Sequence, residues 1–135
     1  MCFGTFDLVH LGHIAYFQEA KKYGDYLIVV VARDVTKKEQ GKETIFSEEE
    51  RRELIQNLAI VDEAVLGYPD NHLKIILQKK PDVICLGYDH NIKEPELRRK
   101  LEVLGLRPQV VRITSYLPAK YKSGKIKRVI LQKFF

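Results

Sequence analysis

Residues 4–13 read Gly-Thr-Phe-Asp-Leu-Val-His-Leu-Gly-His, and both the predicted fold and the predicted site start from them. Gly4 ends a short apolar strand with a glycine turn, and two histidines, His10 and His13, flank the start of the next helix. A helix N-terminus presents unpaired backbone N–H groups and partial positive charge, which together suit a phosphate group. The stretch therefore predicts a strand–turn–helix unit that binds a phosphorylated ligand.

The rest of the chain alternates short apolar runs with amphipathic segments. The apolar runs predict strands over 1–4, 26–32, 64–66, 83–86 and 110–113, and the amphipathic segments predict helices over 11–23, 47–58, 73–79, 94–104 and 125–134. Ser47 and Glu50 have capping-box spacing, and the polar stretch 33–44 is expected to be a loop. The alternation predicts an α/β fold: a Rossmann-like, doubly wound, five-stranded parallel sheet with helices on both faces, in one domain over 1–135.

The composition is that of an ordinary globular protein. The chain has 135 residues, a hydrophobic fraction of 45% and a net charge of +5, which suits an anionic substrate but would also suit nucleic acid. No apolar run is long enough to span a bilayer and no signal-peptide pattern opens the chain, so a cytoplasmic protein is expected. Cys2 and Cys85 lie in apolar runs, which favours buried thiols over a disulfide framework or a zinc site.

The two histidines carry the strongest chemical signal. His10 and His13 are three residues apart on the first turn of a helix, so they can point the same way and donate hydrogen bonds to one phosphate group. Gly12 between them has no side chain to prevent close approach by a nucleotide. The alternative is a pair of polar residues that only begin a helix. The glycine between them and the strand before them favour ligand binding.

These residues also resemble a known family. Gly-Thr-Phe-Asp followed by His-Leu-Gly-His is similar to the HxGH signature of the cytidylyltransferase-like nucleotidyltransferases. In that superfamily a substrate phosphate attacks the α-phosphorus of a nucleoside triphosphate and pyrophosphate leaves, with no covalent enzyme intermediate. The resemblance implies that His10 and His13 are catalytic and stabilise the triphosphate in the transition state. It implies a nucleotide-binding set made of Thr5, Phe6, His10, Leu11, Gly12 and His13.

The resemblance assigns a third catalytic residue in the polar stretch. In similar enzymes a lysine at the position of Lys42 reaches the phosphates, although a loop lysine taken alone is more often solvated. Arg51, in the capped helix, could equally form an ordinary surface ion pair with a neighbouring glutamate. Lys37 and Lys38 are expected to be solvated.

Two further segments follow strands. After the strand at 83–86, Gly87 lets the next residues turn toward the cleft, and in the superfamily an acidic residue at the position of Asp89 can contact the ribose or base; a tight turn is the alternative. His72 and His90 are treated as surface residues.

Before the last helix, similar enzymes carry a Ser/Thr-rich motif that holds the β- and γ-phosphates. Ser123 fits that motif, and Lys125 and Arg128 would add positive charge. Tyr116 is assigned to ligand binding as one of several tyrosines that could form an aromatic wall.

Within the superfamily the chain most resembles the archaeal FAD synthases, on the stretches 32–34, 61–67 and 86–89. That resemblance implies transfer of AMP from ATP to FMN, with a divalent cation, expected to be Mg²⁺, bound through the nucleotide phosphates and no metal site made by the protein itself. It also allows a homodimer. The chain departs from that family in lacking cysteines near its C-terminus.

Three other functions fit parts of the sequence. Glycerol-3-phosphate cytidylyltransferase, which uses CTP, is the close rival, but the segment before the last helix lacks the arginine of that family. A class I aminoacyl-tRNA synthetase is excluded because the chain is too short to hold its additional domains. A non-catalytic nucleotide- or RNA-binding module would need only one charge and backbone groups, so the retained histidine pair counts against it. We therefore expect small-molecule substrates, with no nucleic acid and no membrane as a partner.

Overall fold

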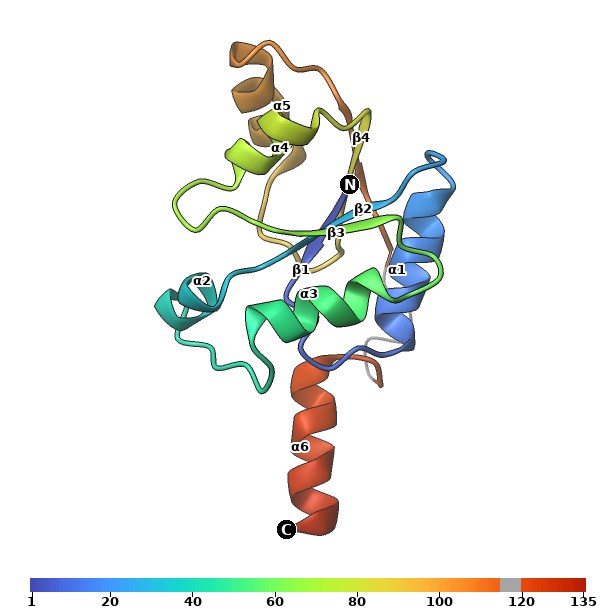
Figure 1. Ribbon diagram of the computed structural model, residues 1–135, viewed down its shortest axis with the longest axis vertical. Helices are drawn as coiled ribbons and strands as arrows, with labels where there is room; N and C mark the ends of the chain where they lie inside the picture. Colours follow the sequence, from blue (N-terminus) through green and yellow to red (C-terminus); the bar gives the residue numbers. More distant parts are fainter. Residues whose placement is uncertain (115–119) are drawn as a thin grey trace.

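A five-stranded parallel sheet forms the centre of the computed structural model, which describes residues 1–114 and 120–135 (Figure 1). Its strands are β1 (Cys2–Gly4), β2 (Ile28–Val31), β3 (Glu63–Leu66), β4 (Val83–Leu86) and β5 (Gln109–Arg112). Their order across the sheet is β3-β2-β1-β4-β5, and every neighbouring pair is parallel. The chain therefore winds outward in both directions from β1, as the doubly wound fold requires.

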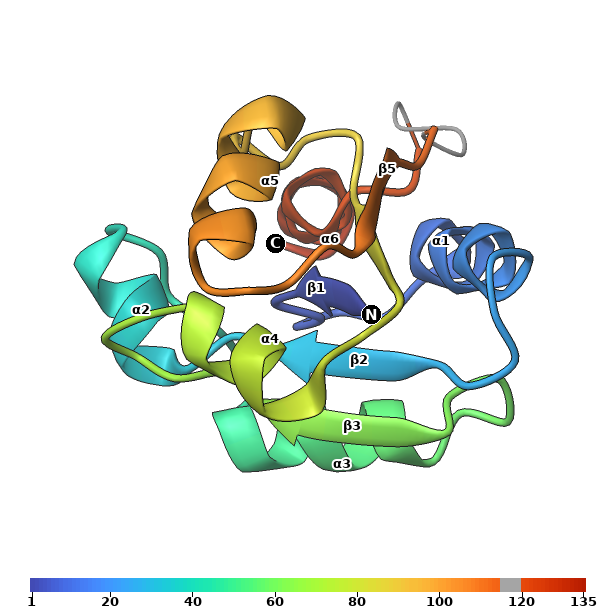
Figure 2. The same cartoon turned by 90° about the horizontal axis from the view of Figure 1, so that it is seen from above.

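Helices cover both faces of this sheet (Figure 2). The two on one face are α1 (Leu11–Lys21) and α3 (Glu48–Gln56), and the two on the other are α4 (Leu73–Lys79) and α5 (Glu94–Val103). In β2, Val29 and Val31 belong to the core on the α1–α3 side and Val30 to the core on the α4–α5 side. A strand buried on both faces reads as a continuous apolar run, which is why the sequence predicted this strand so clearly. The predicted fold class is confirmed.

The local signals for α3 were also correct. Ser47 is its N-cap: the Ser47 hydroxyl accepts from the Glu50 N–H, and the Glu50 carboxylate accepts from the Ser47 N–H. The expected loop at 33–44 was wrong, because Asp34–Glu39 forms a helix, α2. None of the residues of α2, all of which the structure describes, is buried. The helix therefore has no apolar stripe, and an apolar stripe is the signal by which a helix is recognised in a sequence.

The last helix, α6 (Ser123–Phe134), starts two residues earlier than predicted and projects away from the rest of the chain (Figure 1). Within the described part of the chain, no helix is long and apolar enough to cross a membrane.

Candidate active site

A cleft of about 1230 Å³ lies at the carboxyl ends of β1, β2 and β4. This is where the winding direction changes, and so where an open α/β sheet binds its ligands. Of the predicted site residues, those that line it are Thr5, Phe6, His10, Gly12, His13, Lys42, Asp89 and Ser123. The fold therefore brings predicted residues from four separate segments of the chain into one cleft.

One predicted residue in the described part of the chain does not join them. Leu11 is exposed and is not part of the cleft wall, so its assignment to nucleotide binding stays a prediction. Leu11 is the first residue of α1, and His13, two positions further along the helix, faces the cleft, so the two side chains point about 200° apart. Tyr116 lies outside the described residues.

The histidines cap α1 as well as lining the cleft. The Gly12 N–H donates to His10 Nδ1 over 3.1 Å, and the His10 N–H donates to His13 Nδ1 over 3.2 Å. The two rings are stacked, with centroids 3.9 Å apart and planes at 24°. Because each Nδ1 accepts a hydrogen bond, the neutral form of each ring carries its proton on Nε2. Both Nε2–H groups are thus available as donors to a ligand. The histidines therefore cap the helix and can bind a ligand at the same time.

Burial favours the neutral form of both rings. It lowers the pKa of His10, and together with the adjacent His10 ring it lowers the pKa of His13 to about 3. A bound polyphosphate brings negative charge next to these rings, and a nearby opposite charge favours the protonated form. Nucleotide binding should therefore raise both pKa values.

We accordingly expect ATP binding to take up protons, and to take up more as the pH falls from about 8 to about 6 toward the ordinary histidine pKa. The check is titration calorimetry in two buffers of different ionisation enthalpy at each pH. The double variant His10→Asn/His13→Asn serves as the background, because it leaves only the nucleotide's own ionisation. Equal proton uptake by the variant and the unmodified protein would show that the histidines stay neutral when the nucleotide binds.

Phe6 supports the histidines from the core. Its backbone is left-handed, with a φ of 57°, which is rare for a bulky residue and is found at functional sites. Its ring is buried, edge-on to His13 at 5.2 Å and tilted against Phe17 at 5.4 Å. A Cβ on Gly4 would lie 2.5 Å from the Phe6 ring, so Gly4 is needed to admit it. Any contact between Phe6 and a nucleotide falls mainly to its backbone.

Gly12 is required for a reason additional to the predicted close approach of a nucleotide. A Cβ at this position would lie 2.8 Å from Cε1 of His10 and 3.1 Å from Cβ of Tyr121. The absence of a side chain at Gly12 therefore leaves space for the His10 ring, and in this position the ring can face the ligand.

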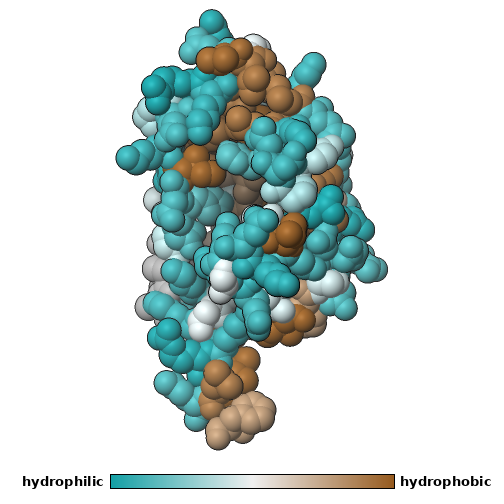
Figure 3. Space-filling view, turned by 90° about the vertical axis from the view of Figure 1, so that its left-hand side faces the viewer, coloured by the Kyte–Doolittle hydropathy of each residue, from teal (hydrophilic) through white to brown (hydrophobic). Residues whose placement is uncertain are grey.

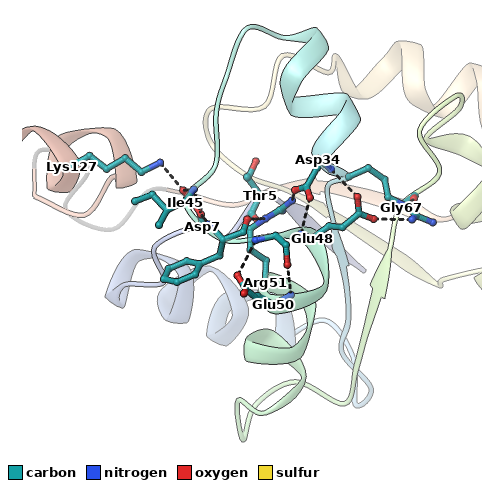
Figure 4. Close-up of polar contacts among 12 residues, drawn as sticks. Thr5, Asp7, Asp34, Ile45, Glu48, Glu50, Arg51, Gly67 and Lys127 are labelled. Carbon is teal, nitrogen blue, oxygen red and sulfur yellow. Dashed lines mark hydrogen bonds and ion pairs between the residues drawn. The ribbon is translucent and has the colours of Figure 1, made fainter.

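Arg51 ties together three segments around the cleft (Figure 4). Its fully buried side chain donates to the Thr5 carbonyl over 2.7 Å, to the Phe46 carbonyl over 3.2 Å and to the Asp34 carboxylate over 2.7 Å. The alternative of a surface ion pair with a neighbouring glutamate was wrong. Its partners lie up to 46 positions away, so no local pattern could have identified them.

Asp7 is a second buried anchor that the sequence analysis did not single out. Its carboxylate accepts from the N–H groups of Ile45 and Phe46 and from Lys127 Nζ, which lies 2.6 Å away (Figure 4). Burial alone would raise the pKa of Asp7, but the Lys127 ammonium and the two amides outweigh it and lower the pKa. The Asp7 carboxylate therefore connects three segments: its own HxGH loop, the residues just before α3, and α6.

The start of α6 closes one end of the cleft. The Ser123 hydroxyl donates to the Leu8 carbonyl over 3.1 Å. Lys127 lines the cleft, whereas Lys125 and Arg128, the residues expected to add charge, do not. Lys127 is four residues after Ser123 and so shares its helix face, a spacing that could have identified it.

Further positive charge comes from the segment after β2. Arg33 and Lys37 line the cleft with Lys42. Lys37 is half-buried there, and its Nζ donates to Gln40 Oε1 in an exposed hydrogen bond, so it is only partly solvated. Burial, the adjacent Lys42 and Arg51 lower the pKa of Lys37. The cluster of cations suits a ligand with several negative charges.

The segment after β4 forms the opposite wall. His90 Nδ1 accepts from the Gly87 N–H over 3.0 Å, and Arg112 donates to the carbonyls of both residues. His90 is therefore a half-buried brace of this wall and was wrongly treated as a surface residue. Asp89 is exposed at the rim of the cleft, and His72, which is exposed as expected, also lines it.

The strand order, the stacked histidine pair at the start of α1 and the basic cleft define a nucleotidyltransferase of the HxGH class. The chain belongs to the cytidylyltransferase-like family, whose model matches residues 1–129.

Its relatives are more specific. The chain is 43% identical to the FAD synthase of Picrophilus torridus over 99% of this chain and 96% of that protein. It is also 43% identical to the FAD synthase of Thermoplasma acidophilum, over 98% and 93%. A crystal structure of a protein from Thermoplasma volcanium, described as a lipopolysaccharide core biosynthesis protein, is 48% identical and superposes with a TM-score of 0.84 over 86% of this chain and 95% of that one.

Proposed function

We propose that this chain is an FMN adenylyltransferase, which transfers AMP from ATP to FMN and yields FAD and pyrophosphate. The observation that carries the proposal is the pair of stacked, neutral histidines at the N-terminus of α1, in a chain that matches FAD synthases over almost their whole length. The family relationship supports the chemistry, and the relatives support the choice of substrates.

In this reaction a phosphate oxygen of FMN attacks the α-phosphorus of ATP while the bond from that phosphorus to the pyrophosphate oxygen breaks. Negative charge moves onto the leaving group, and the Nε2–H groups of His10 and His13 are the donors that meet it. Preoriented donors of this kind contribute about 3–4 kcal/mol each in other enzymes, because they need no reorganisation as the charge develops. Lys42 supplies positive charge beside the β- and γ-phosphates, whereas the charge of Lys127 is balanced by Asp7.

Mg²⁺ would be bound through the phosphates of ATP. The described residues include no group of three or more His, Cys, Asp or Glu side chains placed to bind a metal. The Asp7 carboxylate, although close to the cleft, already accepts from Lys127 and two backbone amides. A cation held by the phosphates would neutralise part of their charge during the transfer.

The cleft has an apolar part that favours a flavin as the acceptor. Away from the histidines its wall includes Val30, Ile75, Ile76, Leu86 and Leu97, with Tyr68 and Tyr88 exposed near the rim. A flat aromatic ring system can bury its area there, whereas glycerol 3-phosphate has no apolar group to place in it.

We expect pyrophosphate release only with ATP and FMN when ATP and CTP are each combined with FMN and with glycerol 3-phosphate in the presence of Mg²⁺. The product is identified as FAD by chromatography. Turnover with CTP and glycerol 3-phosphate would keep the chemistry but overturn the substrates. Nucleotide binding without pyrophosphate release from any pair would favour the binding module.

The proposed substrates also indicate the compartment in which the protein acts. Because ATP and FMN are made and used inside the cell, we propose that the enzyme acts in the cytoplasm on small molecules and needs neither nucleic acid nor a membrane.

A further inference from the structure

The short helix α2 is held in place by polar contacts at its first residue. The Asp34 carboxylate accepts from Arg51 over 2.7 Å and from the Glu48 N–H over 3.1 Å. The Asp34 N–H in turn donates to the Glu48 carboxylate over 3.2 Å. Because α2 contributes no buried residue to the core, packing does not explain which side chains the rest of the helix carries.

One side of α2 faces the cleft. Its residues there are spaced as on one face of a helix, and they are Thr36, Lys37 and Gln40. Lys38 and Glu39, which lie between them in the chain, are exposed and do not line the cleft. Figure 3 faces the side of the molecule where α2 lies, and the middle of that face is mostly hydrophilic, with apolar surface in the hollow between the polar side chains. The cleft side of α2 therefore consists of a hydroxyl, an ammonium and an amide, all of them hydrogen-bond donors.

The donors on this side of α2 are available to a ligand. Lys37 Nζ donates to Gln40 Oε1 over 3.0 Å, so two of its three N–H bonds remain, and the NH₂ of Gln40 is left as a donor. Arg33 and Lys127, which line the same cleft, each pair with a carboxylate. Lys37 takes part in none of the ion pairs among the described residues. A phosphate could therefore supply the counter-charge of this half-buried ammonium.

Lys37 lies between the polyphosphate end and the apolar part of the cleft. Burial, and after it the charges of Lys42 and Arg51, lower the pKa of Lys37. Burial also lowers the pKa of His90, and the charges of Arg112 and Lys37 add to that effect. Lys37 is thus close enough to act both on Lys42, beside the proposed polyphosphate, and on His90, which follows the strand whose last residue belongs to the apolar wall. A phosphate attached to a ring in the apolar part would lie here on its way to the α-phosphorus.

Resting on the proposed function, we propose that Lys37, with the Thr36 hydroxyl and the Gln40 amide, binds the phosphate of the acceptor, FMN. The nucleophile and the leaving group of an in-line displacement lie on opposite sides of the α-phosphorus. Separate groups of donors on the two sides hold the reactants in that geometry. Lys37 therefore determines specificity for a phosphorylated acceptor, because riboflavin has the same ring as FMN but no phosphate.

The test compares how FMN and riboflavin bind, by quenching of flavin fluorescence, in the presence of an ATP analogue with a methylene group between the α- and β-phosphorus. Lys37→Gln should weaken FMN binding about tenfold or more, the scale of one charge-assisted hydrogen bond, and change riboflavin binding by less than about twofold. Lys37→Arg keeps the charge and the donors and should bind FMN within about threefold of the unmodified protein. The matched control is Lys38→Gln, the next lysine of α2 but outside the cleft, which should alter neither affinity. Circular dichroism confirms that each variant is folded.

The outcomes separate this assignment from the proposed function. If the unmodified protein prefers FMN to riboflavin and Lys37→Gln keeps that preference, Lys37 does not bind the acceptor phosphate, while the proposed function stands. An equal rise in the KM values for ATP and FMN would assign Lys37 to the nucleotide instead and overturn the proposal. If the unmodified protein does not prefer FMN and releases no pyrophosphate from ATP and FMN, the proposed function fails and the assignment fails with it.

A second pair of variants separates contact from overall charge. Gln40→Glu places a carboxylate beside Lys37, where it competes with the acceptor phosphate, and should weaken FMN binding about tenfold. Lys38→Glu changes the net charge by twice as much but lies outside the cleft, so it should weaken FMN binding by less than about threefold. A larger effect of Lys38→Glu would show that the charge of the whole surface, and not contact with α2, favours FMN, and would overturn the proposal.

Discussion

Replacing His10 or His13 with alanine is expected to lower kcat by more than about a hundredfold, the effect of removing one preoriented donor to a developing negative charge. The alanine variants lose a second contact, because each Nδ1 accepts a backbone N–H at the start of α1. Loss of such a cap costs about 1 kcal/mol of stability. Steady-state kinetics alone would therefore mix a catalytic effect with a structural one.

Asparagine separates the two effects. Its side-chain oxygen can take the place of Nδ1 and keep the cap, but it has no group at the position of Nε2. His10→Asn and His13→Asn should thus unfold like the unmodified protein in urea and still lose about a hundredfold in kcat. Asparagine variants with near-normal kcat would show that the rings act only as caps, and the proposed mechanism would have to be abandoned.

Arg51→Met is expected to lower the free energy of unfolding by about 3–5 kcal/mol, the usual result of removing one member of a buried charge network. The guanidinium is fully buried and donates to the Thr5 and Phe46 carbonyls, which would lose their partner, whereas the Asp34 side chain is 43% exposed and can be rehydrated. The larger part of the loss therefore comes from the two carbonyls. Urea denaturation followed by circular dichroism measures it.

Arg52→Met is the matched control. Arg52 is next to Arg51 on the same helix, but it is half-exposed and its side chain donates to the Ala64 carbonyl over a long 3.4 Å. Its loss should cost less than about 1 kcal/mol. Equal losses from the two arginines would mean that burial of Arg51 does not determine its contribution.

Much of the fold could be predicted because its signals are local. β2 is a run of β-branched residues, and α3 begins with a capping box. The missed helix α2 has no buried residue among those the structure describes, and its Asp34 is held by contacts with α3. A helix stabilised by polar contacts with a distant segment leaves no periodic pattern in its own sequence.

The candidate site likewise contains residues that local sequence predicts and residues that it does not. His10, Gly12 and His13 lie within four positions of one another, so their geometry follows from helix spacing alone. The anchors are different: Arg51 reaches back 46 positions to Thr5, and Lys127 reaches back 120 positions to Asp7. Each looks like an ordinary surface charge in the sequence. Only the folded topology shows that they surround the HxGH loop.

The bond between Asp7 and Lys127 has a consequence for how the protein is made. Asp7 emerges from the ribosome early, yet the cation that balances its buried charge comes 120 positions later, in the last helix. A nascent chain that has formed all five strands still lacks this cation, and its HxGH loop still lacks the Ser123 contact to Leu8. Enzymatic competence should therefore appear only after α6 has been synthesised, so a translation product interrupted before α6 would be inactive.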